Sequence, residues 1–234
     1  MRAVPIRRSS STVQRHLPFK SNILAPLIYW MLTMLLEIDR LQLATPEPSL
    51  AVDRWTHILG AEVAERSQIR CLSARCTTLR LGSSEVEILE PDGTGLVADA
   101  IARRGPHMFS AGASTQDVGA LKHQLATYTK ESVLEDGRLF VSGDSIDIPG
   151  LRLVVSPYEK RDPVGDIDYL YEATVLAGDA DALTARFAQV FALDAQEFVA
   201  IDSPRFGYNG KLTLFKTRHL HRFEVISPLE LWKP

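Results

Sequence analysis

The stretch "SSEVEILEP" (residues 83–91) alternates as a half-buried strand does, but it sets the acidic residue Glu87 between apolar neighbours. The same ending returns in "LRLVVSP" (residues 151–157) and in "HRFEVISP" (residues 221–228). Each copy closes on a proline, and the residues four positions before the three prolines are Glu87, Leu153 and Glu224. Similar strands at long, regular spacing indicate an internal repeat.

The sequence around these strands predicts the same order of elements three times. From residue 37 onward, a strand is followed by a helix and then by several strands. The predicted fold class is therefore α+β, built of repeated βαβββ modules. We expect these modules at residues 37–95, 104–160 and 166–230, after an N-terminal extension over residues 1–36.

Capping and turn residues predict where some elements begin and end. Ser49 is expected to cap the helix of the first module, and Gly60 to end it. In the third module, Asp179 or Asp181 is expected to cap the helix that follows. The pair Asn209–Gly210 in "GYNGK" is the strongest short signal for a hairpin turn in the sequence.

Composition excludes several classes of partner. The 234 residues are 45% hydrophobic and 24% charged, with a net charge of −3 and a pI near 6.1. This balance gives no general attraction to nucleic acid or to an anionic membrane, so we expect neither partner. Cys71 and Cys76 match no redox or zinc spacing and are expected to be buried or half-buried free thiols. We expect a cytoplasmic location.

Residues 1–36 differ from the rest of the chain, because they contain five basic residues and no acidic one. Their apolar run, residues 23–36, is shorter than the roughly 20 residues of a membrane-spanning helix, and it contains Pro26. A transit peptide, a signal peptide and a natural start at Met31 or Met34 all remain open. We expect this extension to be disordered or upstream of the natural start.

Three segments carry a resemblance to a known family: "IDRLQLAT" (residues 38–45), "VEILEPDG" (residues 86–93), and "GPHMFSAGAS" (residues 105–114) followed by "DVGAL". Over about residues 37–228 the chain resembles the vicinal oxygen chelate family, which contains glyoxalase I, methylmalonyl-CoA epimerase, bleomycin-resistance proteins and extradiol dioxygenases. The resemblance implies that modules pair side by side, the first two enclosing a cleft. A third, C-terminal module then lacks a partner, which implies a homodimer or a lost fourth module.

The resemblance also implies where a divalent metal would bind. In that family, histidines of the opening strands and a carboxylate of a closing strand hold the ion. The corresponding opening-strand residues here are Arg40, Met108 and, in the third module, Tyr171 or Glu172. The closing strands offer Glu87, Leu153 and Glu224. This set does not support a metal, so we assign no metal ligand and leave the cofactor open. A register shift of one residue would replace Met108 by His107. His219 and His221 have the spacing of a metal pair or of a polar edge strand.

We therefore predict a protein that acts on or binds a small, oxygen-rich metabolite in the cleft between the first two modules. Glu87 is the predicted catalytic residue. The predicted substrate-binding residues are Arg40, Gln42, His107 and Met108. Whether the chain is an enzyme stays open. A lyase, isomerase or dioxygenase would fit, and the alternatives are a metal-free binding or resistance-type protein and a truncated, non-catalytic member. Arg40 and Glu87 could equally form a structural ion pair.

Overall fold

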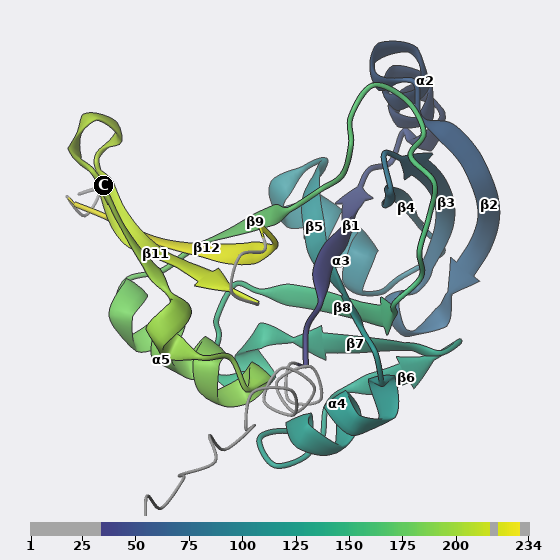
Figure 1. Ribbon diagram of the computed structural model, residues 1–234. Coiled ribbons are helices and arrows are strands. Elements are labelled where there is room, and N and C mark those ends of the chain that lie inside the picture. The colour runs from purple at the N-terminus through teal and green to yellow at the C-terminus, as the bar shows by residue number, and fades with distance from the viewer. Residues whose placement is uncertain (1–33, 216–219, 230–234) are drawn as a thin grey trace, which may run out of the picture. The chain divides into compact units, whose positions relative to one another are not determined.

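The computed structural model describes residues 34–215 and 220–229. Within them, the strands form an eight-stranded sheet in the order β2-β3-β4-β1-β5-β8-β7-β6 and a four-stranded sheet in the order β10-β11-β12-β9 (Figure 1). The first module contains β1 (Glu37–Ala44), α2 (Pro48–Leu59), β2 (Glu62–Ile69), β3 (Ala74–Leu81) and β4 (Ser84–Pro91). The second contains β5 (His107–Thr115), α4 (Val118–Leu125), β6 (Val133–Glu135), β7 (Arg138–Ser142) and β8 (Arg152–Pro157). The third contains β9 (Glu172–Leu176), α5 (Ala180–Phe191), β10 (Val199–Ser203), β11 (Tyr208–Leu214) and β12 (Arg222–Pro228).

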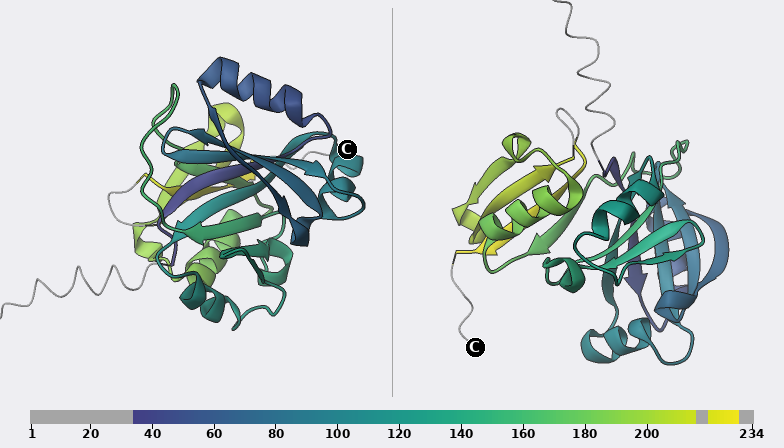
Figure 2. Two further views of the ribbon diagram at one scale, coloured as in Figure 1. Left: turned by 90° about the vertical axis from the view of Figure 1, so that its right-hand side faces the viewer. Right: turned by 90° about the horizontal axis from the view of Figure 1, so that it is seen from below.

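The three modules share one strand pairing, which confirms the predicted repeat of βαβββ units. In each, the opening strand pairs in parallel with the closing strand, as β1·β4, β5·β8 and β9·β12. The other pairs within a module are antiparallel. The first two modules join through the antiparallel pair β1·β5 and thus form one curved sheet (Figures 1 and 2).

Alternation along β4 decides which way Glu87 points. Val86 and Ile88 are fully buried against helix α2 on the outer side of the sheet, where they pack with Trp55 and Leu59. Because successive side chains of a strand point to opposite faces, Glu87 points to the inner, concave side. The acidic residue therefore interrupts the apolar pattern without entering the core beneath α2.

The inner face of the eight-stranded sheet has a polar layer and an apolar layer. Gln42, Glu87, Thr78, Arg138 and Ser156 belong to the polar layer. Two residues away on the same five strands, after Gln42, Glu87 and Arg138 and before Thr78 and Ser156, stand Ala44, Leu89, Phe140, Cys76 and Val154, which form one buried cluster with Phe109. Helix α3 (Leu96–Arg104), which the sequence analysis missed, adds Val97 and Ala100 to that cluster. The apolar layer thus fills one part of the concavity and leaves the polar layer beside open space.

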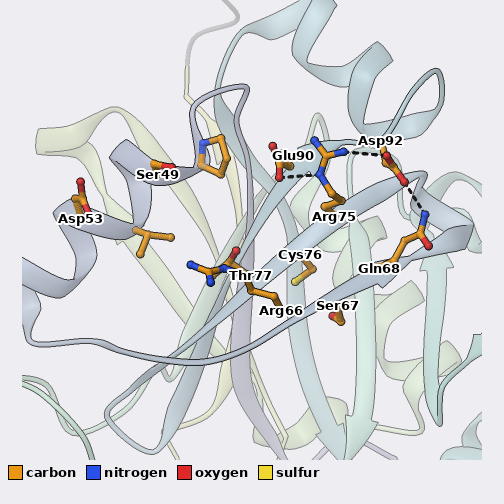
Figure 3. A pocket seen from close by; sticks show the side chains of 12 residues that line it. Ser49, Asp53, Arg66, Ser67, Gln68, Arg75, Cys76, Thr77, Glu90 and Asp92 are labelled. Carbon is orange, nitrogen blue, oxygen red and sulfur yellow. Dashed lines mark hydrogen bonds and ion pairs between the residues drawn. The ribbon is translucent and has the colours of Figure 1, made fainter.

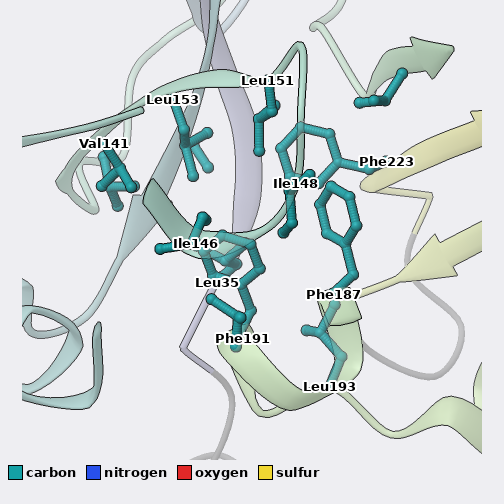
Figure 4. Packing of buried hydrophobic residues seen from close by; sticks show 14 of the residues in the cluster. Leu35, Val141, Ile146, Ile148, Leu151, Leu153, Phe187, Phe191, Leu193 and Phe223 are labelled. Carbon is teal, nitrogen blue, oxygen red and sulfur yellow. The ribbon is translucent and has the colours of Figure 1, made fainter. Parts of the chain in front are cut away.

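A second buried cluster contains side chains of the second and third modules. Leu153 on β8 and Leu151 before it lie in the same cluster as Phe187 and Phe191 of α5 and Phe223 of β12 (Figure 4). The rings of Phe187 and Phe223 lie 5.0 Å apart between centroids. Aromatic pairs at this distance add to the stabilisation from burial alone.

Two of the predicted element boundaries are wrong, and two are confirmed. Helix α2 begins at Pro48, with Glu47 rather than Ser49 in the capping position, because proline is suited to the first helical turn. Gly60 ends that helix in a left-handed conformation with φ 68°, as predicted. Asp179 caps α5 by accepting a hydrogen bond of 2.9 Å from the backbone N–H of Ala182.

The predicted hairpin turn at Asn209–Gly210 is also wrong, because both residues lie inside β11. The chain turns instead over Pro204–Phe206. A Cβ atom on Gly210 would stand 2.0 Å from the carbonyl oxygen of Val225 on β12. This glycine is therefore required for close approach of two strands, and not for a turn.

Residues 1–33 of the expected extension lie outside the described part of the chain, whereas Leu35 and Leu36, just before β1, are buried. Cys71 is half-buried and Cys76 buried, and both are free thiols, as predicted. Among the described residues, no helix is long and apolar enough to cross a membrane.

Candidate functional site

Glu87 is fully buried and accepts hydrogen bonds from three side chains. Its Oε1 lies 2.7 Å from Nη1 of Arg40 and 2.6 Å from Nη1 of Arg138, and its Oε2 lies 2.6 Å from Nε2 of Gln42. Strand register explains the contact with Gln42, because this residue pairs directly with Glu87 across β1 and β4. Arg138 comes from β7 of the second module. The carboxylate therefore joins the two modules from inside the concavity.

Arg40 is the centre of a wider ion-pair network. Besides Glu87, its guanidinium contacts Asp39 at 3.1 Å and Glu85 at 2.9 Å. Arg161 adds contacts of 3.5 Å to Asp39 and 3.4 Å to Glu85. The network thus contains three arginines (Arg40, Arg138 and Arg161) and four carboxylates (Asp39, Glu85, Glu87 and Glu159, which lies 3.4 Å from Arg161), so it has no excess of positive charge.

The side chain of Arg40 reaches this position across a glycine of β5. Arg40 pairs with Gly112 in the antiparallel register of β1 and β5. A Cβ atom on Gly112 would stand only 1.7 Å from Cγ of Arg40. Only a residue without a side chain leaves room for the aliphatic part of the arginine.

The pKa values of Glu87 and Glu85 are shifted in opposite directions. Burial by itself would raise the pKa of Glu87, but Arg40 and Arg138 together with the hydrogen bond from Gln42 outweigh it and lower the pKa. Glu85 differs, because burial raises its pKa and Arg40 and Arg161 compensate only in part. Glu87 is therefore ionised at neutral pH.

We expect these shifts to appear in the acid unfolding of the protein. A lowered folded-state pKa means that Glu87 contributes stability above its ordinary pKa of 4.5, and that this contribution is lost as the pH falls below that value. The folded-state pKa of Glu85 is raised, so its effect on stability has the opposite sign. As the pH falls toward 4.5, the folded state binds this proton before the unfolded state does, and Glu85 makes the protein more stable. Urea unfolding between pH 7 and pH 3 should show a steep loss of stability below pH 4.5 that is flatter in Glu87→Gln. Equal slopes below pH 4.5 in both proteins would contradict the geometry.

An open cleft of about 540 Å³ lies beside this network. Its walls include the network residues Arg40, Glu85, Glu87, Arg138 and Arg161. Hydrogen-bonding side chains from both modules complete it, among them Ser67, Gln68, Thr78 and Ser156. Such a space, with a few convergent polar groups, is typical of a small-molecule site.

Ser156 is the polar group of this cleft that lacks a partner. Its side chain is buried, yet its Oγ has no hydrogen-bond partner among the described residues. Ser114, its register neighbour on β5, has a buried hydroxyl in the same condition. Buried hydroxyls are nearly always satisfied in proteins, so an unsatisfied one on a residue that lines an open cleft points to a bound molecule or water as its partner.

No protein-family model and no curated protein sequence matches the chain. Among solved structures, a triple mutant of 4-hydroxymandelate synthase from Streptomyces coelicolor superposes with a TM-score of 0.63 at 14% identity, over 83% of this chain and 63% of the synthase. The match covers about 194 of the 234 residues of this chain. The first two modules, at residues 37–160, contain only 124 residues, so the match extends into the third module. The chain has the vicinal oxygen chelate fold.

Shorter structures also match part of the chain. Methylmalonyl-CoA epimerase from Mycobacterium tuberculosis aligns with 54% of this chain and 91% of its own at 13% identity, with a TM-score of 0.48. The epimerase of Streptomyces coelicolor, in complex with 2-nitronate-propionyl-CoA, aligns with 52% of this chain and 98% of its own at 19% identity, with a TM-score of 0.45.

The metal that the vicinal oxygen chelate fold implies does not fit the residues present. At the inner positions of the opening strands stand Arg40, Gln42, Ser110 and Gly112, which supply no imidazole or carboxylate. The carboxylates of β4 that line the cleft, Glu85 and Glu87, are each already held by two guanidinium groups. A divalent ion beside either carboxylate would be repelled by both of its arginines. Within residues 34–215 and 220–229, no group of three or more metal-ligating side chains is placed to hold an ion.

The cleft of this vicinal oxygen chelate fold is lined by two of the five predicted site residues, Arg40 and Glu87. Gln42 is hydrogen-bonded to Glu87 but does not line the cleft, and neither do His107 and Met108. A bulge opposite Gln42 and Leu43 turns Phe109 inward and leaves the Met108 side chain 64% exposed. The ring of His107 lies 2.7 Å from the Gly105 carbonyl oxygen. Substrate contact by His107 and Met108 stays a prediction.

Most lining residues of the cleft were missed, among them Arg138, Ser156 and Arg161. Arg138 and Ser156 could have been found from the alternation of "RLFVS" and "LRLVVSP", in which both stand on the face opposite the buried leucines and valines. Arg161 comes from an irregular segment, for which alternation gives no signal.

The corresponding positions of the third module are occupied differently. Glu224 accepts a hydrogen bond of 2.8 Å from Thr174, and Glu172 pairs with Arg222 at 2.6 Å. Nδ1 of His221 lies 3.2 Å from the backbone N–H of Ile38, while His219 lies outside the described residues. Glu224 thus lies near the surface, and its sheet has no buried equivalent of the Glu87 network among the described residues.

A further hollow, of about 510 Å³, lies between α2 and the strands β2, β3 and β4 (Figure 3). Its charged groups are largely paired with one another. Arg75 contacts Glu90 at 2.9 Å and Asp92 at 3.0 Å, and Gln68 donates to Asp92. Because these pairs satisfy each other, the hollow is a weaker candidate for a ligand than the cleft beside Glu87.

Proposed function

We propose that the chain binds a small, neutral, oxygen-rich metabolite in the cleft between the first two modules. The observation that carries this proposal is the buried, unpartnered hydroxyl of Ser156 on the wall of that cleft. A hydroxyl or carbonyl of the ligand would satisfy it, which removes the cost of leaving a buried polar group unpaired.

The charge of the cleft favours a neutral ligand. Its three arginines are paired with four carboxylates, so no positive charge is left over for a carboxylate or phosphate. The remaining charged residues of the cleft are Glu65 and Asp136, which are acidic. An anion would be repelled by this rim, whereas hydroxyls and carbonyls can exchange hydrogen bonds with Ser67, Thr78 and Ser156.

Glu87 would act on such a ligand through its neighbours. Its side chain has no exposed surface, while Arg138, which it holds at 2.6 Å, is 19% exposed toward the cleft. A carboxylate with a lowered pKa is a poor proton acceptor at neutral pH. We therefore propose Glu87 as the residue that orients Arg138 and Gln42, and binding as the function that its position supports best.

A single hydroxyl deletion tests the proposal. We expect Ser156→Ala to weaken ligand binding about 3–10-fold, which corresponds to one lost neutral hydrogen bond, and to leave the unliganded protein as stable as before, because this hydroxyl has no partner in the described chain. Glycerol, dihydroxyacetone, erythritol and hexoses, each with its carboxylated or phosphorylated analogue, would be screened by ligand-detected NMR and titrated by calorimetry.

Ser227→Ala is the matched control. Ser227 also precedes the proline of a closing strand and also has a buried hydroxyl with no partner in the described part of the chain, but it belongs to β12 of the third module. Its replacement should not change the affinity. If Ser156→Ala and Ser227→Ala bind as the wild type does, or if only the anionic analogues bind in competition with one another, the proposal fails.

We also propose that the protein forms a homodimer through its third module. In the eight-stranded sheet the opening strands β1 and β5 pair with each other, whereas β9 stands at the edge of its sheet in the described chain. A second copy could pair with this edge in the antiparallel sense, as β1 pairs with β5. Light scattering should give about twice the mass of one chain, and a monomer at micromolar concentration would contradict the pairing. The cytoplasmic location stays a prediction.

A further inference from the structure

Three arginines gather where helix α3 ends near β8, and no carboxylate pairs with them. Arg103 and Arg104 lie in the last turn of α3, and Arg152 opens β8. Among the described residues, none of the three takes part in an ion pair or in a hydrogen bond from its side chain. Arginines at the C-terminal end of a helix are stabilised by the helix dipole, which accounts for Arg103 and Arg104. It does not account for Arg152.

Arg152 is half-buried, and its surroundings disfavour its charge. Its guanidinium lies 4.6 Å above the ring of Phe109, which supplies the contact on one side. Burial lowers the pKa of Arg152, and the charges of Arg104 and Arg103 lower it further, whereas Asp144 acts in the opposite direction. An anion between the arginines would relieve this repulsion.

Arg104 and Arg152 line a hollow of about 620 Å³. Most of its other walls are apolar and come from β5, β8, β9 and the residues that precede them. They include Met108, which is 64% exposed, and Leu176, which is 69% exposed, together with Leu151, Leu170 and Val175. The one acidic side chain in the wall, Glu172, is paired with Arg222 at 2.6 Å. The hollow thus combines unpaired positive charge with exposed apolar surface.

We propose that this hollow binds a small anionic amphiphile, with its carboxylate or phosphate head between Arg104 and Arg152 and its apolar chain against Met108, Leu151 and Leu176. Guanidinium groups suit both heads, because their N–H donors match the oxygens of carboxylate and phosphate. Exposed apolar side chains next to such donors gain from contact with a hydrocarbon chain.

This hollow is separate from the cleft beside Glu87. The two spaces share only Arg40 among their lining residues, and the charge of Arg40 is already balanced by three carboxylates. The balanced cleft favours a neutral ligand, and the unbalanced hollow favours an anion. The proposal therefore stands independently of the function proposed for the cleft.

Calorimetric titration with octanoate and with octyl phosphate, below their critical micelle concentrations, tests the proposal. We expect both to bind more tightly than acetate, inorganic phosphate, octanol or octylamine, and the tighter of the two identifies the preferred head. The Arg104→Gln/Arg152→Gln variant should bind at least about tenfold more weakly, since two charge-assisted hydrogen bonds are lost. Met108→Ser should weaken the binding of octanoate but not the binding of acetate.

Arg103→Gln is the matched control, because Arg103 belongs to the same helical turn as Arg104 but does not line the hollow. The affinity of this variant for octanoate should change less than threefold. Ser156→Ala should leave octanoate binding unchanged, which distinguishes this site from the cleft. Circular dichroism and thermal unfolding would establish that the variants are folded. Binding of octanol as tight as that of octanoate, equal binding by the double variant, or no binding of either anion at millimolar concentration would overturn the proposal.

Discussion

Replacing Arg40 by methionine is expected to lower the free energy of unfolding by about 3–5 kcal/mol. The change removes the group that, within the described part of the chain, contacts Asp39, Glu85 and Glu87 together, and it leaves the fully buried Glu87 with one arginine in place of two. A buried charge that loses its partner still has the full free-energy cost of desolvation, and the attraction that offset this cost is gone. Urea unfolding at pH 7, followed by circular dichroism, measures the effect.

The surface pair around Arg75 gives a matched comparison for this variant. Arg75 also contacts two carboxylates, Glu90 and Asp92, but its side chain is largely exposed. Because water and salt screen exposed ion pairs, Arg75→Met should change stability far less than Arg40→Met. The double variant Arg40→Met/Glu87→Leu should be less destabilised than the sum of its two single variants, since both charges are then removed. Additive effects would mean that the pair is not coupled.

Gly112→Ala is expected to destabilise the protein by about 3 kcal/mol or more, although only one methyl group is added. That methyl would stand 1.7 Å from Cγ of Arg40, so the arginine must leave its place and lose its ion pairs. Overpacking alone costs about 1–3 kcal/mol, and the disrupted network adds to it. The midpoint temperature of thermal unfolding and the affinity of the cleft for its ligand should both fall.

Gly178→Ala is the control for added volume, because a Cβ atom there meets no atom within 4 Å. Its stability should stay close to that of the wild type. A crystal structure of Gly112→Ala that shows the Arg40–Glu87 contact intact would disprove the explanation, whatever the stability of the variant.

Most of the fold could be predicted from the alternation of apolar and polar residues along the strands and from the internal repeat. The three closing strands could be recognised because each ends on proline, and the inner position of Glu87 follows from its buried neighbours Val86 and Ile88. The pair Gln42–Glu87 was also predictable, since it needs only one strand register. Local sequence rules failed where a contact between distant strands decides the residue type. At Gly210 the rule predicts a turn, but the glycine is needed because β11 and β12 approach each other closely there.

The rest of the site depends on features that no local pattern contains. The bulge in the pairing of β1 and β5 shifts the inner face by one residue, so that Phe109 rather than Met108 points inward. Arg138 reaches Glu87 from the other module, and only the closed arrangement of the sheet brings the two within 2.6 Å. Alternation assigns a residue to a face, but it cannot tell which residues of distant strands meet on that face.

The apolar layer under the cleft, where Phe109, Phe140 and Val154 pack with helix α3, closes one end of the concavity. A molecule bound beside Arg138 would therefore have to arrive and depart on the sides of the cleft away from this packed apolar layer.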